Sequence, residues 1–186
     1  MTRLASPVAP PPSADADGDG FRAFFDANVG LVWRSLLGLG VASADAADAS
    51  QQVFVVLHSK LARWDRQGSL RAFMYGICLR VASDYRRRAH RQRERLVSEV
   101  PEVASVGLTP EEAAASRQEL RMLEGALNQL PPAQREVFIL FEIEELDMTE
   151  VAQAVGCPLF TAYSRLRAAR RTIGVHLRAL DGRLPR

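Results

Sequence analysis

The sequence is poor in the residues that cross-link, ligate or catalyse. Its 186 residues include two cysteines and three histidines, and their spacing matches neither a metal site nor a disulfide framework. Paired acids and bases, nucleophile sets and phosphate-binding loops are missing as well. We therefore predict a protein that is not an enzyme, binds no metal and needs no cofactor. Cys78 and Cys157 are expected to be free thiols in a reducing compartment.

Long apolar runs are also missing. No stretch approaches the roughly 18 residues that a membrane-spanning helix requires. Residues 1–20 contain several prolines followed by DADGDG, and they lack the basic-then-apolar order of a signal peptide. These observations predict a cytoplasmic protein without membrane insertion, with residues 1–20 as a disordered tail.

Lysine is nearly absent, since Lys60 is the only lysine among 24 basic residues, and the arginines are unevenly distributed. The net charge of +2 conceals three blocks. Residues 63–95 hold ten arginines against three acids, residues 111–150 hold ten acids against three arginines, and residues 160–186 hold seven arginines against one aspartate. Two basic blocks around an acidic one predict two contacts with a polyanion and a different partner between them.

Apolar residues recur at helical intervals and rarely alternate with polar ones, so the predicted fold class is all-α. We expect two small helical domains, 21–95 and 109–186, joined by a short linker at 96–108. Expected helices cover residues 21–39, 44–64, 70–95, 109–130 and 133–141, and a helix-turn-helix follows them.

Residues 147–171 carry the strongest local pattern. Asp147 and Glu150 form a capping box at the start of one short helix, which Gly156 ends before Pro158 opens the next. The second helix has an apolar stripe of Leu159, Ala162, Leu166, Ala169, Ile173, Leu177 and Leu180, and it leaves outside that stripe Thr161, Ser164, Arg165, Arg167 and Arg171. This is the plan of a helix-turn-helix DNA reader. The alternative is an ordinary helical hairpin with a solvated basic face.

The C-terminal half resembles a known family. Residues 130–173 resemble the C-terminal domain of bacterial RNA polymerase sigma factors, through the segments Leu130-Pro131-Pro132, Arg135-Glu136-Val137-Phe138, Gly156-Cys157-Pro158, Thr161, Ser164-Arg165-Leu166 and Ala169-Arg170.

The N-terminal half is similar to the second region of the same family. The matching residues are Asp48, Gln51, Val53 and Phe54, then the segment from Gly68 to Tyr75, then Asp84 with Arg86, Arg87 and Arg88. With two domains and a short linker, the chain resembles the small extracytoplasmic-function type. Five positions depart from the family pattern: Gln52 for Glu, Arg80 for Asn, Phe160 for Gly, Ala162 for Val and Tyr163 for Lys.

The resemblance implies three sets of contact residues. The recognition helix would read minus-thirty-five DNA with Phe160, Thr161, Tyr163, Ser164, Arg165, Arg167 and Arg171. Minus-ten DNA would be opened by Arg71, Tyr75, Arg80, Asp84, Arg87 and Arg88. Core polymerase would bind Asp48, Gln51, Gln52 and Phe54. Among the aromatic residues, Phe73 is expected in the core and Tyr75 on the DNA side. Residues 86–95 are expected to contact phosphates, or else to form a solvated helix end.

The implied function is promoter-specific initiation in partnership with core RNA polymerase and promoter DNA, with an anti-sigma factor as a further expected partner. The acidic segment Glu142–Glu145 would face a basic surface of the polymerase or simply aid solubility. Two other interpretations stay open. One is a helix-turn-helix regulator that acts without being a polymerase subunit, and the other is a sigma-like protein that no longer supports initiation.

Overall fold

The computed structural model describes residues 18–61, 64, 69–95 and 122–181. Within these ranges the regular structure is helical and contains no strand, so the all-α prediction is confirmed. The elements are α1(Gly18–Gly38), α2(Ser43–Leu61), α3(Leu70–Arg95), α5(Pro132–Phe138), the π-helix η1(Ile139–Ile143), α6(Met148–Val155) and α7(Leu159–Asp181). Residues 122–128 are helical as well. Residues 1–17 of the predicted tail, the linker 96–108 and the helix start at Thr109 lie outside the described residues. The prediction of a disordered tail was wrong for residues 18–20, which form the start of α1.

Side-chain caps set the helix boundaries where the sequence placed them. The hydroxyl of Ser69 accepts a hydrogen bond from the Arg71 backbone N–H at 3.2 Å, at the start of α3. At α6, the Glu150 N–H donates to Asp147 at 2.8 Å and the Asp147 N–H donates to Glu150 at 3.2 Å. Gly156 then adopts a left-handed conformation with φ 66°. The predicted capping box and glycine stop are therefore confirmed.

The helix expected at 133–141 takes a different form. Regular α-helix ends at Phe138, and the chain continues as a π-helix to Ile143. The wider turn brings both Ile139 and Leu140 into the core. Leu146 N–H donates to the Leu140 carbonyl at 2.9 Å, and Glu145 adopts a positive φ of 53°. A π-turn is rare and is frequently found at functional sites, and this one directs Glu144 toward the N-terminal half.

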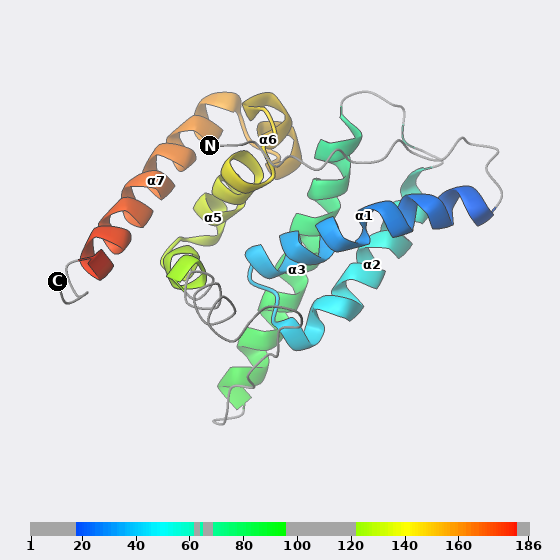
Figure 1. Cartoon of the computed structure of the whole chain (residues 1–186), viewed down its shortest axis with the longest axis horizontal. Coiled ribbons are helices and arrows are strands. Elements are labelled where there is room, and N and C mark those ends of the chain that lie inside the picture. The colour runs from blue at the N-terminus through cyan, green and yellow to red at the C-terminus, as the bar shows by residue number, and fades with distance from the viewer. Residues whose placement is uncertain (1–17, 62–63, 65–68, 96–121, 182–186) are drawn as a thin grey trace, which may run out of the picture.

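The helices form two groups that pack side by side (Figure 1). Helices α1, α2 and α3 make one group and α5, α6 and α7 make the other, with α3 lying against α6. The buried apolar residues of both groups belong to one continuous cluster. At Gly76 the backbones of α3 and α6 approach closely, because a Cβ built there would lie 3.5 Å from the Ala154 carbonyl oxygen.

Two arginines join the groups at the turn after α1. Arg86 pairs with Glu136 at 2.9 Å and also donates to the Leu39 carbonyl. The Arg135 Nε donates to the Gly38 carbonyl at 2.7 Å. Burial, reinforced by the nearby charge of Arg86, lowers the pKa of Arg135 to about 10, so this side chain stays charged at neutral pH. Arg86 thus differs from the expectation of a phosphate contact, because its guanidinium is committed to carbonyl and carboxylate partners within the chain.

Gly40 lies under these two arginines and provides the first testable prediction. Its φ is +90°, and a Cβ there would lie 3.0 Å from Arg135 Nη1 and 3.4 Å from Arg86 Cδ. Gly40→Ala should lower the free energy of unfolding by about 1–2 kcal/mol, because left-handed backbone disfavours a side chain. Gly30→Ala, within α1 with Arg34 Nη1 at 3.5 Å as its nearest neighbour, should instead leave it unchanged or raise it. Chemical denaturation of both variants measures the difference, and equal effects would contradict the account.

Candidate nucleic-acid interface

Helix α7 presents one polar and aromatic stripe to solvent. Phe160 is 83 % exposed and Tyr163 is 51 % exposed, and Ser164, Arg167 and Arg171 are exposed beside them. These positions follow intervals of three or four residues, so they share one face of the helix. The N-terminal turns of the second helix in a helix-turn-helix are the part that enters the major groove. The exposed stripe therefore lies where base and phosphate contacts would be made.

The opposite face of α7 is buried as the sequence predicted over its central turns. Ala162, Leu166, Ala169 and Ile173 are all buried. The prediction of burial was wrong at Leu159 and Leu177, because both are exposed. Leu180 lies where side chains are not described. The apolar repeat of α7 continues past the helices that pack against it. Those packing partners decide where burial stops.

Three further polar residues of α7 lie at the margins of the stripe. Thr161 and Arg165 are half-buried at its sides. Arg170 belongs to a different contact, because it pairs with Glu142 at 2.6 Å and lies over the Phe141 ring at 5.6 Å. Of the recognition-helix residues named from the sequence, the exposed subset is thus Phe160, Tyr163, Ser164, Arg167 and Arg171.

Helix α3 carries a second basic stripe. Arg80, Arg87, Arg88 and Arg91 are exposed along one side of the helix. Asp84 lies among them and pairs with Arg87, and Arg88 lies over the Tyr85 ring at 5.3 Å. Arginines spaced along a helix in this way suit phosphate contacts that give affinity without reading sequence.

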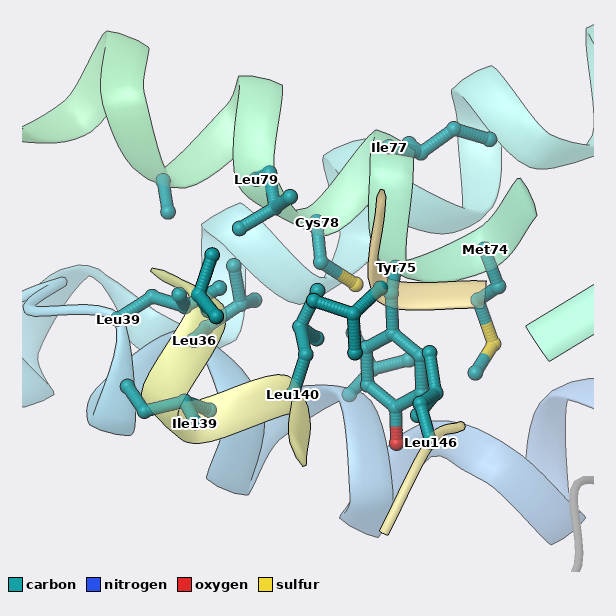
Figure 2. Close-up of a cluster of buried hydrophobic side chains, with 14 of the residues drawn as sticks. Leu36, Leu39, Met74, Tyr75, Ile77, Cys78, Leu79, Ile139, Leu140 and Leu146 are labelled. Atoms are coloured by element: carbon teal, nitrogen blue, oxygen red, sulfur yellow. The ribbon is translucent and has the colours of Figure 1, made fainter. Parts of the chain in front are cut away.

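Two residues that were predicted to contact minus-ten DNA are not exposed in this structure. Tyr75 is fully buried, and its hydroxyl donates to Glu144. Figure 2 shows its ring beside Leu140 and Leu146 of the C-terminal half. Burial, together with the charge of Glu144, raises the pKa of Tyr75 well above its ordinary value. Arg71 is half-buried and donates to the Glu144 backbone carbonyl.

The expected ranking of the aromatic residues is therefore reversed. Phe73, expected in the core, is only partly buried and stacks on Trp64 at 5.7 Å between ring centroids. Tyr75, expected on the DNA side, has no exposed surface. The expectation for Tyr75 rested on nearby arginines in the sequence, and that for Phe73 rested on the usual burial of an aromatic side chain. The environment of each ring instead depends on which helix packs against α3.

Helix α2 shows which polymerase-binding residues are accessible. Asp48 and Gln51 are exposed and Gln52 is half-buried. Phe54 is a core residue, since it is 3 % exposed and its ring meets the ring of Phe25 at 4.6 Å. In this structure the buried side chain of Phe54 is not positioned for a direct contact, and it packs between α2 and α1. Its part in polymerase binding stays a prediction.

An apolar groove between α1 and α2 was missed from the sequence. Its lining includes Val29, Trp33 and Gln51, and Trp33 is 38 % exposed. Val55, one turn beyond Gln51, is 68 % exposed. A tryptophan and a valine held at the surface beside an amide are features of protein-binding surfaces. The sequence did contain a signal for this surface, because Val55 is an apolar residue on the otherwise polar side of α2.

Two glutamates of the acidic segment have partners within the chain. Glu142 pairs with Arg170 of α7, and Glu144 contacts the N-terminal half of its own chain.

Among the described residues no group of histidine, cysteine and carboxylate side chains is suited to hold a metal. None of the described helices has the length and apolar character of a membrane span.

Comparisons with known proteins agree with this geometry. Residues 24–92 match the family model described as Sigma-70 region 2, and residues 120–173 match Sigma-70, region 4. The chain is similar to the ECF RNA polymerase sigma factor SigD of Mycobacterium tuberculosis, with 36 % identity over 131 residues, 70 % of this chain and 58 % of SigD. The matched part thus covers less than two thirds of SigD.

Two solved structures share the fold. The complex of CnrH with the cytosolic domain of CnrY superposes with a TM-score of 0.68 at 21 % identity, and it covers 89 % of this chain and 92 % of that one. The sigma factor RpoE of Bartonella quintana, bound to the anti-sigma factor NepR, superposes with a TM-score of 0.67 at 20 % identity, over 85 % and 96 %.

The exposed stripe of α7 leads to a prediction about charge. Arg167→Ala should weaken binding to duplex DNA by ~1 kcal/mol or more and reduce the slope of log affinity against log salt by about one. Arg178→Ala makes the same charge change on the last turn of α7, beyond the stripe, and should have a much smaller effect. Fluorescence anisotropy at several salt concentrations measures both. An equal loss in the two variants would show general charge attraction instead of a docked helix.

Proposed function

This chain belongs to the sigma-70 family, in its extracytoplasmic-function type, and from that membership we propose that it binds core RNA polymerase and directs it to specific promoters. It would carry out no covalent chemistry itself. Its contribution would be binding energy that positions the polymerase and holds the promoter open. The place of action would be the cytoplasm, where the polymerase transcribes.

One observation carries the proposal. The chain combines a helix-turn-helix whose recognition face is exposed with a separate helical group that carries its own basic helix, and both match sigma-70 regions in the family order. A DNA-binding module alone explains α6 and α7. It does not explain α3 with its exposed arginines, or the groove beside Gln51.

In the proposed mechanism α7 enters the major groove of the minus-thirty-five element. Arg167, at the centre of the exposed stripe, is placed to contact a guanine edge or a phosphate, and a good bidentate guanine contact is worth roughly 1–3 kcal/mol. Phe160 and Tyr163 would contact thymine methyl groups or sugars. These aromatic side chains depart from the Gly and Lys of the family pattern, so the DNA sequence that this chain prefers should differ from the one usual in the family.

At the minus-ten element, α3 would hold the opened strand. Unstacking bases costs a few kcal/mol per step, and aromatic stacking recovers roughly 1–3 kcal/mol per base. Trp64 and Phe73 form the stacked aromatic pair nearest to the exposed Arg80. Arg87 and Arg88 would contact the backbone. Tyr75 would join this surface only after the C-terminal half has moved away from it.

An anti-sigma factor is the third proposed partner. Both structural relatives described above are complexes with a partner, CnrH with the cytosolic domain of CnrY and the sigma factor RpoE with the anti-sigma factor NepR. We extend that partnership to this chain because it shares their fold over most of its length.

Transcription from fragmented genomic DNA tests the function. Core polymerase is supplied with and without this protein, and RNA start sites are mapped. The proposal expects new, discrete starts that share two upstream elements. If polymerase binding is intact and no starts appear, the chain is a sigma-like protein that does not support initiation.

A second candidate function has one observation in its favour. The recognition stripe of α7 is open in this structure, whereas part of the α3 surface is covered by α6. A regulator that uses only the helix-turn-helix would need no more than this. The absence of new starts, together with promoter binding that is independent of polymerase, would establish that function instead.

The groove beside α2 supplies a prediction on polymerase affinity. Gln51→Arg places a long charged side chain at the mouth of this groove and should weaken core polymerase binding about tenfold, ~1.4 kcal/mol. Ser59→Arg adds the same charge at an exposed position of α2 outside the groove and should bind normally. Affinities measured by surface plasmon resonance compare the two. Equal affinities would locate the polymerase contact elsewhere.

A further inference from the structure

Glu144 makes an unusual set of contacts for a residue of an acidic surface segment. Its carboxylate accepts a hydrogen bond from the Ser35 hydroxyl on one oxygen and from the Tyr75 hydroxyl on the other. Its backbone carbonyl accepts a third from the Arg71 guanidinium. All three donors belong to α1 and α3, in the other half of the molecule. One residue of the C-terminal half therefore occupies donors on two helices of the N-terminal half.

The backbone around Glu144 is shaped for this insertion. The π-helix η1 precedes it, and Glu145 follows it with a positive φ of 53°. Both conformations cost free energy and persist only where the surroundings compensate. Together they direct the Glu144 side chain and its carbonyl toward the same neighbouring helices.

Charge favours the same arrangement over longer distances. The described part of the acidic block, 122–150, lies in the half that packs against the described part of the basic block, 69–95. Two polar contacts join the blocks at separate points, one from Arg71 to Glu144 and one from Arg86 to Glu136. The segregation of charge along the sequence therefore produces attraction between the two halves, and salt should weaken it.

The packed arrangement brings the two proposed DNA surfaces too close together. Arg80 of α3 and Gln153 of α6 line the same cavity, of about 430 Å³, with Trp64 and Phe73 on its wall. Elements centred near positions −10 and −35 lie about 25 base pairs apart, which is ~85 Å at 3.4 Å per base pair. Helix α7 follows α6 within the same helix-turn-helix, so the recognition stripe at the start of α7 stays near α3 while α6 packs there. The two surfaces then cannot reach elements that lie ~85 Å apart, so the halves must separate before a promoter is engaged.

We propose that Glu144 is an intramolecular latch that holds the protein in a closed, promoter-incompetent conformation, and that release of Glu144 from Ser35, Tyr75 and Arg71 opens it. The consequence for promoters rests on the proposed function, whereas the latch itself does not. Opening uncovers Tyr75 and frees Arg71. In the closed form the Nε of Arg71 is buried without a hydrogen-bond partner, a cost that opening removes.

Small-angle X-ray scattering of the full-length protein, without polymerase, tests the latch. The unmodified protein should scatter as a compact particle. Glu144→Ala should shift the closing equilibrium at least about tenfold toward an extended particle, because hydrogen bonds to a carboxylate are among the stronger ones. Glu142→Ala is the matched control, because it removes the same charge from the same segment and contacts only Arg170 within the C-terminal half. It should remain compact.

A second variant removes a latch contact on the N-terminal half. Ser35→Ala removes one donor and leaves the acidic segment unchanged, so it should shift scattering in the same direction by less. Circular dichroism must show unchanged helicity in each variant, which separates opening from unfolding. Combined with Glu144→Ala, the Ser35→Ala change should add nothing further. An extended unmodified protein, or a Glu144→Ala variant as compact as the Glu142→Ala control, would overturn the latch.

Transcription distinguishes the latch from the function it serves. Because only the open fraction can engage a promoter, Glu144→Ala should start transcription at protein concentrations several-fold lower than the unmodified protein requires. If scattering shows opening and that concentration is unchanged, the latch exists without inhibiting initiation, and the inhibitory part is overturned. If scattering shows opening while neither protein initiates transcription, the proposed function fails and the latch stands.

Discussion

The contact of Glu144 with Ser35, Tyr75 and Arg71 is the constraint on which the arrangement of the two halves depends. Apolar packing alone joins surfaces without specifying a single orientation, because the hydrophobic effect is not directional. Hydrogen bonds to both carboxylate oxygens and to the same residue's carbonyl specify direction from three sides. The π-helix and the positive φ of Glu145 are the local cost of presenting one residue in this way.

A second group of contacts, around Arg86 and Arg135, supports that orientation at the turn after α1. There the guanidinium groups donate to the carbonyls of Gly38 and Leu39, and Gly40 leaves room for them. Between the two groups of contacts, α6 lies against α3 at Gly76. The conformation that results presents the recognition face of α7 while covering part of α3. The same chain can therefore bind one DNA element in this conformation and two DNA elements in a different one.

Local patterns predicted much of the site. The capping box at Asp147, the glycine stop at Gly156 and the buried stripe from Ala162 to Ile173 depend on residues a few positions apart. Such patterns lie within a few helical turns, so the sequence alone shows where a helix begins, where it ends and which of its sides is apolar. The exposed stripe of α7 follows directly from the buried one, because a helix has only one other side.

By itself the sequence determined the helical class, the helix-turn-helix, the side of α7 that faces outward and the separation of charge along the chain. The tertiary structure alone decided that Tyr75 and Phe54 are buried, that Arg86 is bound within the molecule and that Glu144 inserts between α1 and α3. Each of these depends on which helix packs against which. A residue's periodicity gives its direction from its own helix axis, whereas its environment is set by elements far away in the sequence, as the 109-residue separation of Ser35 and Glu144 illustrates.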